Sequence, residues 1–199
     1  MRFRNLAGLS FALALAPPAA FAQTAQATTV QTFEDVVPCN NNPNFPGDPV
    51  GQYGPVNYGA QWNCYGWAQA PYTPHSGTNR VYTFNASAPF LFTGGPVVFN
   101  GAWFSGFPDA TVQFQLFLGA VLVGTSGTLS PSDVPAFLSS GYSGLIDRVQ
   151  VLSPRPDFYI MDDVTFNTSA VPEPASMTLL GTGLVGLYGI ARRRRNRAA

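Results

Sequence analysis

Apolar and polar side chains alternate with a period of two through the middle of the chain. In residues 111–118, TVQFQLFL, four apolar side chains share one face and two glutamines share the other. A period of two is typical of a half-buried β-strand, whereas a helix repeats every 3.6 residues. The same reading predicts eight short strands in all, near residues 30–33, 80–84, 89–93, 97–104, 111–118, 120–124, 145–152 and 158–166.

Turn residues separate these segments, which favours a two-sheet fold. Gly, Pro, Asn and Ser lie between the expected strands, as in β-sandwiches and jelly rolls. No segment between them has a convincing helical pattern, and residues 131–139 could form one helical turn at most. The sequence therefore predicts an all-β, jelly-roll-like β-sandwich spanning residues 23–170.

Charge within this domain excludes one class of partner. Residues 24–170 contain nine acidic side chains and three arginines, Arg80, Arg148 and Arg155, a net charge of −6. A surface of that sign repels phosphate backbones, so we expect no nucleic-acid binding.

The first 22 residues have the three parts of a secretory signal peptide. Arg2 and Arg4 make a basic start, an apolar run covers residues 6–16, and Ala-Phe-Ala ends at Ala22. The run is too short to span a bilayer. We expect cleavage after Ala22, with residues 25–27 as a second cleavage site and a buried N-terminal helix as the alternative.

Near the other end, residues 175–191 form a 17-residue segment without charge. As a helix it would be about 26 Å long, at the short end of what crosses a hydrocarbon core. An arginine cluster follows it, made of Arg192, Arg193, Arg194, Arg195 and Arg197. Arginines at a membrane edge mark the cytoplasmic side, so we expect a single transmembrane helix with the sandwich facing outward. A buried core helix with a basic tail is the alternative.

A short proline motif precedes that segment: Val171, Pro172, Glu173 and Pro174. Two prolines exclude a helix and favour an extended spacer. Together, this motif, the glycine-rich apolar segment and the arginine cluster resemble the PEP-CTERM sorting signal over residues 171–197.

The resemblance implies a Gram-negative protein exported by the Sec route and processed by an exosortase. It implies an inner-membrane anchor facing the periplasm before processing, and the cell surface or extracellular space afterwards. Such proteins are often linked with exopolysaccharide and biofilm. A permanent single-pass anchor is the alternative; a GPI signal fits worse because arginines follow the apolar run.

Cys39 and Cys64 are the two cysteines of the chain. In an exported protein such a pair predicts a disulfide. The bridge would close a loop with little strand pattern. Free thiols or half of a metal site are the alternatives.

Asp162 lies among apolar neighbours in the last expected strand. If residues 158–166 alternate regularly, Asp162 shares the face of Phe158, Ile160, Val164 and Phe166. A buried carboxylate needs a cation or several hydrogen-bond donors.

A calcium ion could satisfy this carboxylate. Glu34 and Asp35 follow the first strand, which often pairs with the last one, and Ca²⁺ prefers oxygen ligands. A structural Ca²⁺ is therefore one hypothesis. A β-bulge that turns Asp162 outward, or a salt bridge to Arg148 or Arg80, are the alternatives.

A second resemblance concerns the fold. Phe33-Glu34-Asp35 and residues 158–166 (FYIMDDVTF) are similar to the opening and closing strands of carbohydrate-binding-module-like jelly rolls. In some such modules a late acidic residue, here Asp162 or Asp163, helps to hold a structural calcium.

Aromatic residues that could bind a sugar gather in one region. Flat rings stack on the C–H faces of pyranoses, but aromatic side chains also fill cores. The candidates are Trp62, Tyr65, Trp67, Tyr72 and, farther on, Trp103.

Catalytic motifs are absent from the sequence. His75 is the one histidine, it lies between turn residues, and no G-x-S-x-G, Walker, G-x-G-x-x-G or H-E-x-x-H motif occurs. We expect a non-catalytic protein of the cell envelope or extracellular matrix. A carbohydrate-binding module on the same sorting signal is the second hypothesis, and a glycan-active hydrolase is the third.

Overall fold

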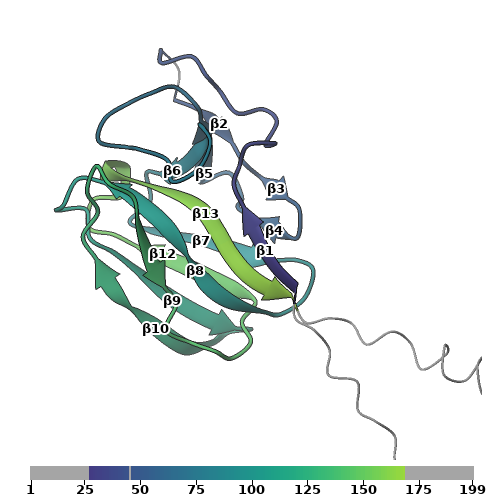
Figure 1. The fold of residues 1–199 in the computed structure, drawn as a ribbon. Coiled ribbons are helices and arrows are strands. Elements are labelled where there is room, and N and C mark those ends of the chain that lie inside the picture. The colour runs from purple at the N-terminus through teal and green to yellow at the C-terminus, as the bar shows by residue number, and fades with distance from the viewer. Residues whose placement is uncertain (1–26, 45, 169–199) are drawn as a thin grey trace, which may run out of the picture.

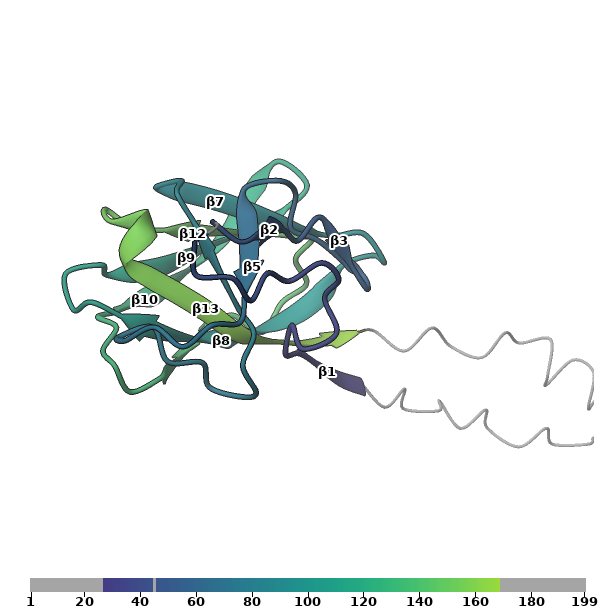
Figure 2. The same ribbon diagram turned by 90° about the horizontal axis from the view of Figure 1, so that it is seen from above.

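A computed structural model describes residues 27–44 and 46–168, which form two β-sheets packed face to face (Figure 1, Figure 2). The expected signal peptide, sorting motif, transmembrane segment and arginine cluster lie outside these residues. Within them, no helix is both long and apolar enough to cross a membrane.

Sheet A, the seven-stranded sheet, has the order β11-β8-β13-β6-β5-β2, and β1 pairs with the second half of β13. Its strands are β1 (Ala27–Gln31), β2 (Asp48–Pro49), β5 (Trp62–Tyr65), β6 (Arg80–Thr83), β8 (Val97–Gly106), β11 (Ala136–Ser139) and β13 (Tyr159–Thr168).

Sheet B, the six-stranded sheet, has the order β10-β9-β12-β7-β4-β3. Its strands are β3 (Gln52–Tyr53), β4 (Val56–Asn57), β7 (Ser87–Phe92), β9 (Val112–Leu118), β10 (Val121–Leu129) and β12 (Arg148–Leu152). A 3₁₀ turn, η1 (Pro156–Phe158), precedes β13. The prediction of an all-β two-sheet sandwich is confirmed.

Aromatic side chains fill the space between the sheets. Phe99 of sheet A and Phe114 of sheet B meet edge to face, with ring centroids 5.0 Å apart. Val112, Phe114 and Leu116 are fully buried, so the alternation correctly identified the inner face of β9 for three of its four apolar side chains, whereas Leu118 at the strand end is 41% exposed. Burial of this kind contributes about 1.5–3 kcal/mol for each large apolar side chain.

All eight expected strands are present, and five strands were not anticipated. Strands β2 to β4 lie between the two cysteines and have only two residues each, too few to show alternation, and β5 contains Cys64. Residues 131–139, which the sequence allowed at most one helical turn, contain β11 at Ala136–Ser139. This strand pairs with β8 at Gly101, whose φ of +147° and lack of a side chain allow the close approach.

Strand β13 is not regular, and this corrects the alternation expected for residues 158–166. The register with β8 shifts between Asp162 and Thr165, and Asp163 has a φ of +45°. This β-bulge reverses the phase of the strand. Met161 before it and Val164 after it both point into the core, while Asp162 turns to the outer face of sheet A.

The predicted disulfide between Cys39 and Cys64 is confirmed, with a Cα–Cα distance of 5.0 Å. Cys64 belongs to β5 and is fully buried, and the chain between the two cysteines contains strands of both sheets. The bridge therefore attaches the first loop to the sandwich.

We expect Cys39→Ala to lower the free energy of unfolding by about 3 kcal/mol, because a bridge across a separation of 25 residues restricts the unfolded chain. Urea denaturation measures the change. The exposed control Val134→Ala should stay within about 0.5 kcal/mol of the parent. A loss below about 1 kcal/mol in Cys39→Ala would contradict a stabilising bridge.

Candidate functional site

An aromatic pocket of about 230 Å³ lies on the outer face of sheet A. Six aromatic residues line it, from β5, from β6 and the residue after it, from the loop that joins these strands and from β13: Tyr65, Trp67, Tyr72, Tyr82, Phe84 and Tyr159. Polar atoms come from Gln69 and Asp157, and the first residues of β13 close one side. We call this site the aromatic pocket.

The strand pattern explains why these rings gather. In β6, Val81 and Thr83 are fully buried, so Tyr82 and Phe84 point to the opposite, outer face. Tyr82 meets Tyr65 of the neighbouring β5 edge to face at 5.4 Å and Phe84 at 5.2 Å. The Phe84 ring is 61% exposed and is therefore available to a ligand.

Arg80 holds both ends of the loop formed by residues 66–79. Its guanidinium lies 4.2 Å from the centroid of the Tyr65 ring. It donates one hydrogen bond to the carbonyl of Thr78, at 2.8 Å, and another to the carbonyl of Trp67. The pocket wall that carries Trp67 is thus tied to the strand beneath it.

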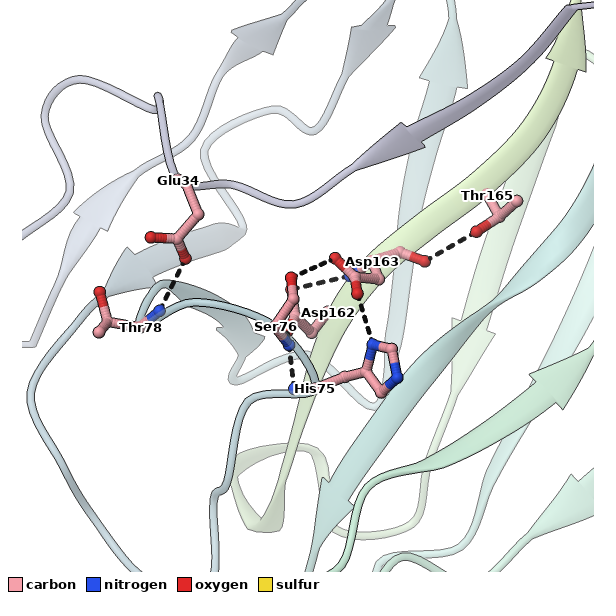
Figure 3. A network of polar contacts seen from close by, with 7 residues as sticks. All are labelled: Glu34, His75, Ser76, Thr78, Asp162, Asp163 and Thr165. Atoms are coloured by element: carbon pink, nitrogen blue, oxygen red, sulfur yellow. Dashed lines mark hydrogen bonds and ion pairs between the residues drawn. The ribbon is translucent and has the colours of Figure 1, made fainter.

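Two carboxylates at the β13 bulge bind the far part of the same loop (Figure 3). The carboxylate of Asp162 accepts backbone N–H groups from His75 at 2.8 Å and from Ser76 at 3.0 Å. Asp163 contacts Nδ1 of His75 at 2.5 Å and accepts the hydroxyl of Ser76 at 2.8 Å. The bulge places these two consecutive side chains on the loop side of the sheet.

Glu34 fixes the end of the loop. Its carboxylate accepts the backbone N–H group of Thr78 at 2.9 Å (Figure 3). It also accepts the backbone N–H group of Asn79, at 2.7 Å. Gly77 has a φ of +53°, and a Cβ there would collide with the Glu34 carboxylate. These contacts let the chain turn closely around one acidic group.

Burial changes the ionisation of Asp162. Desolvation raises the pKa of Asp162 to about 7, and the adjacent Asp163 also raises it. The backbone donors of Ser76, Asp163 and His75 act in the opposite direction because they stabilise the charged form. Beside the pocket, burial raises the pKa of Tyr65 to about 12, so its phenol stays neutral.

The four acidic residues proposed for calcium do not converge on one point. Asp162 and Asp163 bond to the loop, Glu34 bonds to Thr78 and Asn79, and Asp35 accepts the hydroxyl of Tyr53. Among residues 27–44 and 46–168, no group of three or more His, Cys, Asp or Glu side chains could hold a metal ion. The bulge, one of the alternatives to calcium, is present, and the calcium site stays a prediction.

The five aromatic candidates fall into three places. Tyr65, Trp67 and Tyr72 line the aromatic pocket. Trp62 is fully buried in the core, where its indole N–H donates to the carbonyl of Pro89 at 3.1 Å. Trp103 lies outside the pocket and stacks on His75 with ring centroids 3.5 Å apart.

Two pocket residues, Tyr82 and Phe84, were not among the candidates. Both lie in the predicted strand of residues 80–84, at alternate positions. That alternation is a sequence signal for a shared face. It did not identify them as ligand-binding residues, because an aromatic face can equally belong to the core.

His75, the single histidine, contacts the carboxylate of Asp163 through its Nδ1 atom. Ser76 donates its hydroxyl to Asp163 and not to His75. The three side chains therefore do not form the serine-to-histidine-to-aspartate order of a hydrolytic triad.

We expect the free energy of unfolding to fall between about pH 4 and pH 7. The pKa of Asp162 is higher in the folded state than in the unfolded chain, so protonation stabilises the fold and this contribution is lost as pH rises. The slope is at most about 1.4 kcal/mol per pH unit. Urea denaturation across this range should show a weaker slope in Asp162→Asn.

The control for this experiment is Asp133→Asn, which changes an exposed carboxylate and should keep the parental slope. His75 and Asp163, the titratable groups in contact with this network, are unchanged in Asp162→Asn. Equal slopes in the parent and in Asp162→Asn would show that Asp162 does not titrate in this window.

Comparison with known proteins identifies the sorting signal. Residues 170–195 match the PEP-CTERM protein-sorting motif, which includes Val171 to Pro174 and four of the arginines. This motif implies export, processing by an exosortase and sorting to the cell surface. No curated protein matches the chain.

Several solved structures of family 29 carbohydrate-binding modules have a similar fold. A point mutant of CBM29-2 is 14% identical, covers 73% of this chain and 94% of its own, and has a TM-score of 0.40. A family 29 module is also 14% identical, covers 76% and 97%, and has a TM-score of 0.37. These values do not identify a ligand. The chain thus carries a PEP-CTERM sorting motif directly after a two-sheet β-sandwich.

Proposed function

We propose that this protein is an exported, non-catalytic surface protein whose β-sandwich binds a neutral polysaccharide of the extracellular matrix. The sorting motif supports the location, and one observation supports the binding function. That observation is the aromatic pocket, where rings from two adjacent strands and one loop line the same hollow.

The shape of the pocket suits a sugar ring. Trp67 and Tyr65 lie with ring centroids 4.4 Å apart and planes 43° from parallel. Phe84 extends the aromatic surface toward solvent. Flat apolar surfaces of this kind can cover the C–H face of a pyranose, while polar groups at the rim bond its hydroxyls.

Charge favours a neutral sugar over an acidic one. The carboxylate at the rim belongs to Asp157, and residues 24–170 have a net charge of −6. Of the nearby cations, Arg80 is buried and donates to the carbonyls of Thr78 and Trp67. Arg155 forms an ion pair with Asp109 and lies over the ring of Phe158. A polyuronic acid would meet like charge without a free partner for its carboxylates.

The sorting motif connects this pocket with its ligand. In the proposed course, the Sec route exports the chain, the C-terminal segment anchors it in the inner membrane, and an exosortase then processes it. The domain thereby reaches the surface where exopolysaccharide is displayed. Binding to that polymer would give it a role in the matrix or biofilm.

Affinity electrophoresis of the full chain in detergent tests the proposal. Gels containing neutral glucans or mannans should retard the protein, and gels containing alginate or polygalacturonate should not. Trp67→Ala and Tyr82→Ala should each weaken binding about 30-fold, because a buried aromatic anchor contributes about 2 kcal/mol.

The matched control is Phe137→Ala, which removes a 39% exposed ring of β11 that does not line the pocket. It should bind like the parent. Full retardation of Trp67→Ala would place the ligand elsewhere. No retardation of the parent in any polysaccharide would favour a purely structural matrix protein.

A further inference from the structure

One end of the sandwich brings together the first and last described residues. Ala27 pairs with Thr168, Thr168 pairs with Val97, and Val97 forms a bridge with Ile146. Figures 1 and 2 both show the start of β1 beside the end of β13. We call this the terminal end, and it includes loops 93–97, 117–122 and 140–147.

The turn between β9 and β10 lies at the same end. The backbone N–H of Gly119 donates to the carboxylate of Asp147 at 2.8 Å, and the N–H of Asp147 donates to the carbonyl of Phe117 at 2.9 Å. Asp147 directly follows Ile146, which forms a bridge with Val97, and Val97 pairs with Thr168. These bonds therefore attach the β9–β10 turn to the same end of the sandwich as Thr168.

Large apolar side chains are exposed here. Val121 is 63% exposed, Leu145 42% and Leu118 41%. A hollow of about 250 Å³ opens beside Leu145 and is lined also by residues 55, 94–97 and 168, none of them charged. The one charged side chain within these three loops is Asp147, whose carboxylate accepts the N–H of Gly119.

The chain leaves this end toward the sorting motif. The match to that motif begins at residue 170, and six residues separate Thr168 from the apolar segment 175–191. Even fully extended, this connection spans only about 24 Å. While that segment is in the membrane, the terminal end is therefore held within reach of the lipid surface.

We infer that the domain docks onto the lipid bilayer through Leu118, Val121 and Leu145 before it is processed. This inference rests on the membrane-anchored stage of the proposed function. Apolar side chains at loop tips gain by leaving water. Beside them, Asp147 accepts the Gly119 N–H, and the guanidinium of Arg148 lies 4.1 Å from the centroid of the Phe117 ring, a cation of the kind found at the headgroup level of a bilayer.

Docking in this way orients the aromatic pocket. Of the residues that line the pocket, Asp157 lies in η1 directly before β13 and Tyr159 is the first residue of β13, whereas Thr168 is its last. Strand β13 has ten residues and is about 30 Å long. The pocket consequently lies toward the end of the domain that is farther from the bilayer, where polymer outside the membrane can reach it.

Site-specific fluorescence in phosphatidylcholine vesicles tests the inference on the full chain. Val121→Cys and Leu145→Cys are each labelled with an environment-sensitive thiol probe, which the native cysteines do not take up because they form a disulfide. We expect nitroxide lipids to quench both probes, and an aqueous quencher to reach them at least threefold less than a probe at the control position.

The control is Val134→Cys. Val134 is 67% exposed, close to the 63% of Val121, but its loop lies at the opposite end, where Ser132 accepts the N–H of Gly106. A probe there should stay in water. Having two labelled positions at the terminal end guards against a local change at either one.

Co-flotation of the chain with the vesicles separates the possible failures. If the protein floats but the probes at 121 and 145 are no more quenched by lipid than the probe at 134, the docking inference alone is overturned. Shielding from the aqueous quencher without lipid quenching would also overturn it and indicate a second copy of the chain. Without co-flotation, the anchored stage and the inference both fail.

Discussion

The hydrogen bonds between the β13 bulge and loop 66–79 determine the outer face of sheet A. Asp162 and Asp163 are buried, and the loop supplies the donors that make their burial tolerable. The two carboxylates in turn hold loop 66–79, which contains no strand, against the outer face of sheet A. Trp67 and Tyr72 belong to this segment, so the walls of the aromatic pocket depend on two acidic groups that do not line it.

The inner face of the sandwich could be predicted and the outer face could not, for a physical reason. Inner positions repeat every second residue because the pleat alternates, and β9 follows that rule from Val112 to Leu116. In β13 one additional residue reverses the phase, so Asp162, expected among apolar side chains, lies outside with Ile160. A bulge needs only one residue with positive φ, here Asp163, and an aspartate pair does not by itself indicate such a position.

The aromatic residues show a similar limit. Trp62 and Trp67 are five positions apart and chemically identical, yet Trp62 lies in the core and Trp67 in the pocket. What separates them is that β5 ends at Tyr65, after which the chain leaves the sheet. Sequence composition located the cluster, whereas the register between β5 and β6 decided which rings share a surface, and it added Tyr82 and Phe84.

The two ends of β13 carry unlike surfaces, and this difference follows from how the strand is paired. Its first half lies beside β6, whose outward rings line the pocket. Its second half lies beside β1, which begins at Ala27, the first described residue. Because one strand connects them, the distance between pocket and terminal end is set by a rigid element and not by a linker. A ligand in the pocket is thereby kept about one strand length, ~30 Å, from Thr168, the last described residue before the sorting motif.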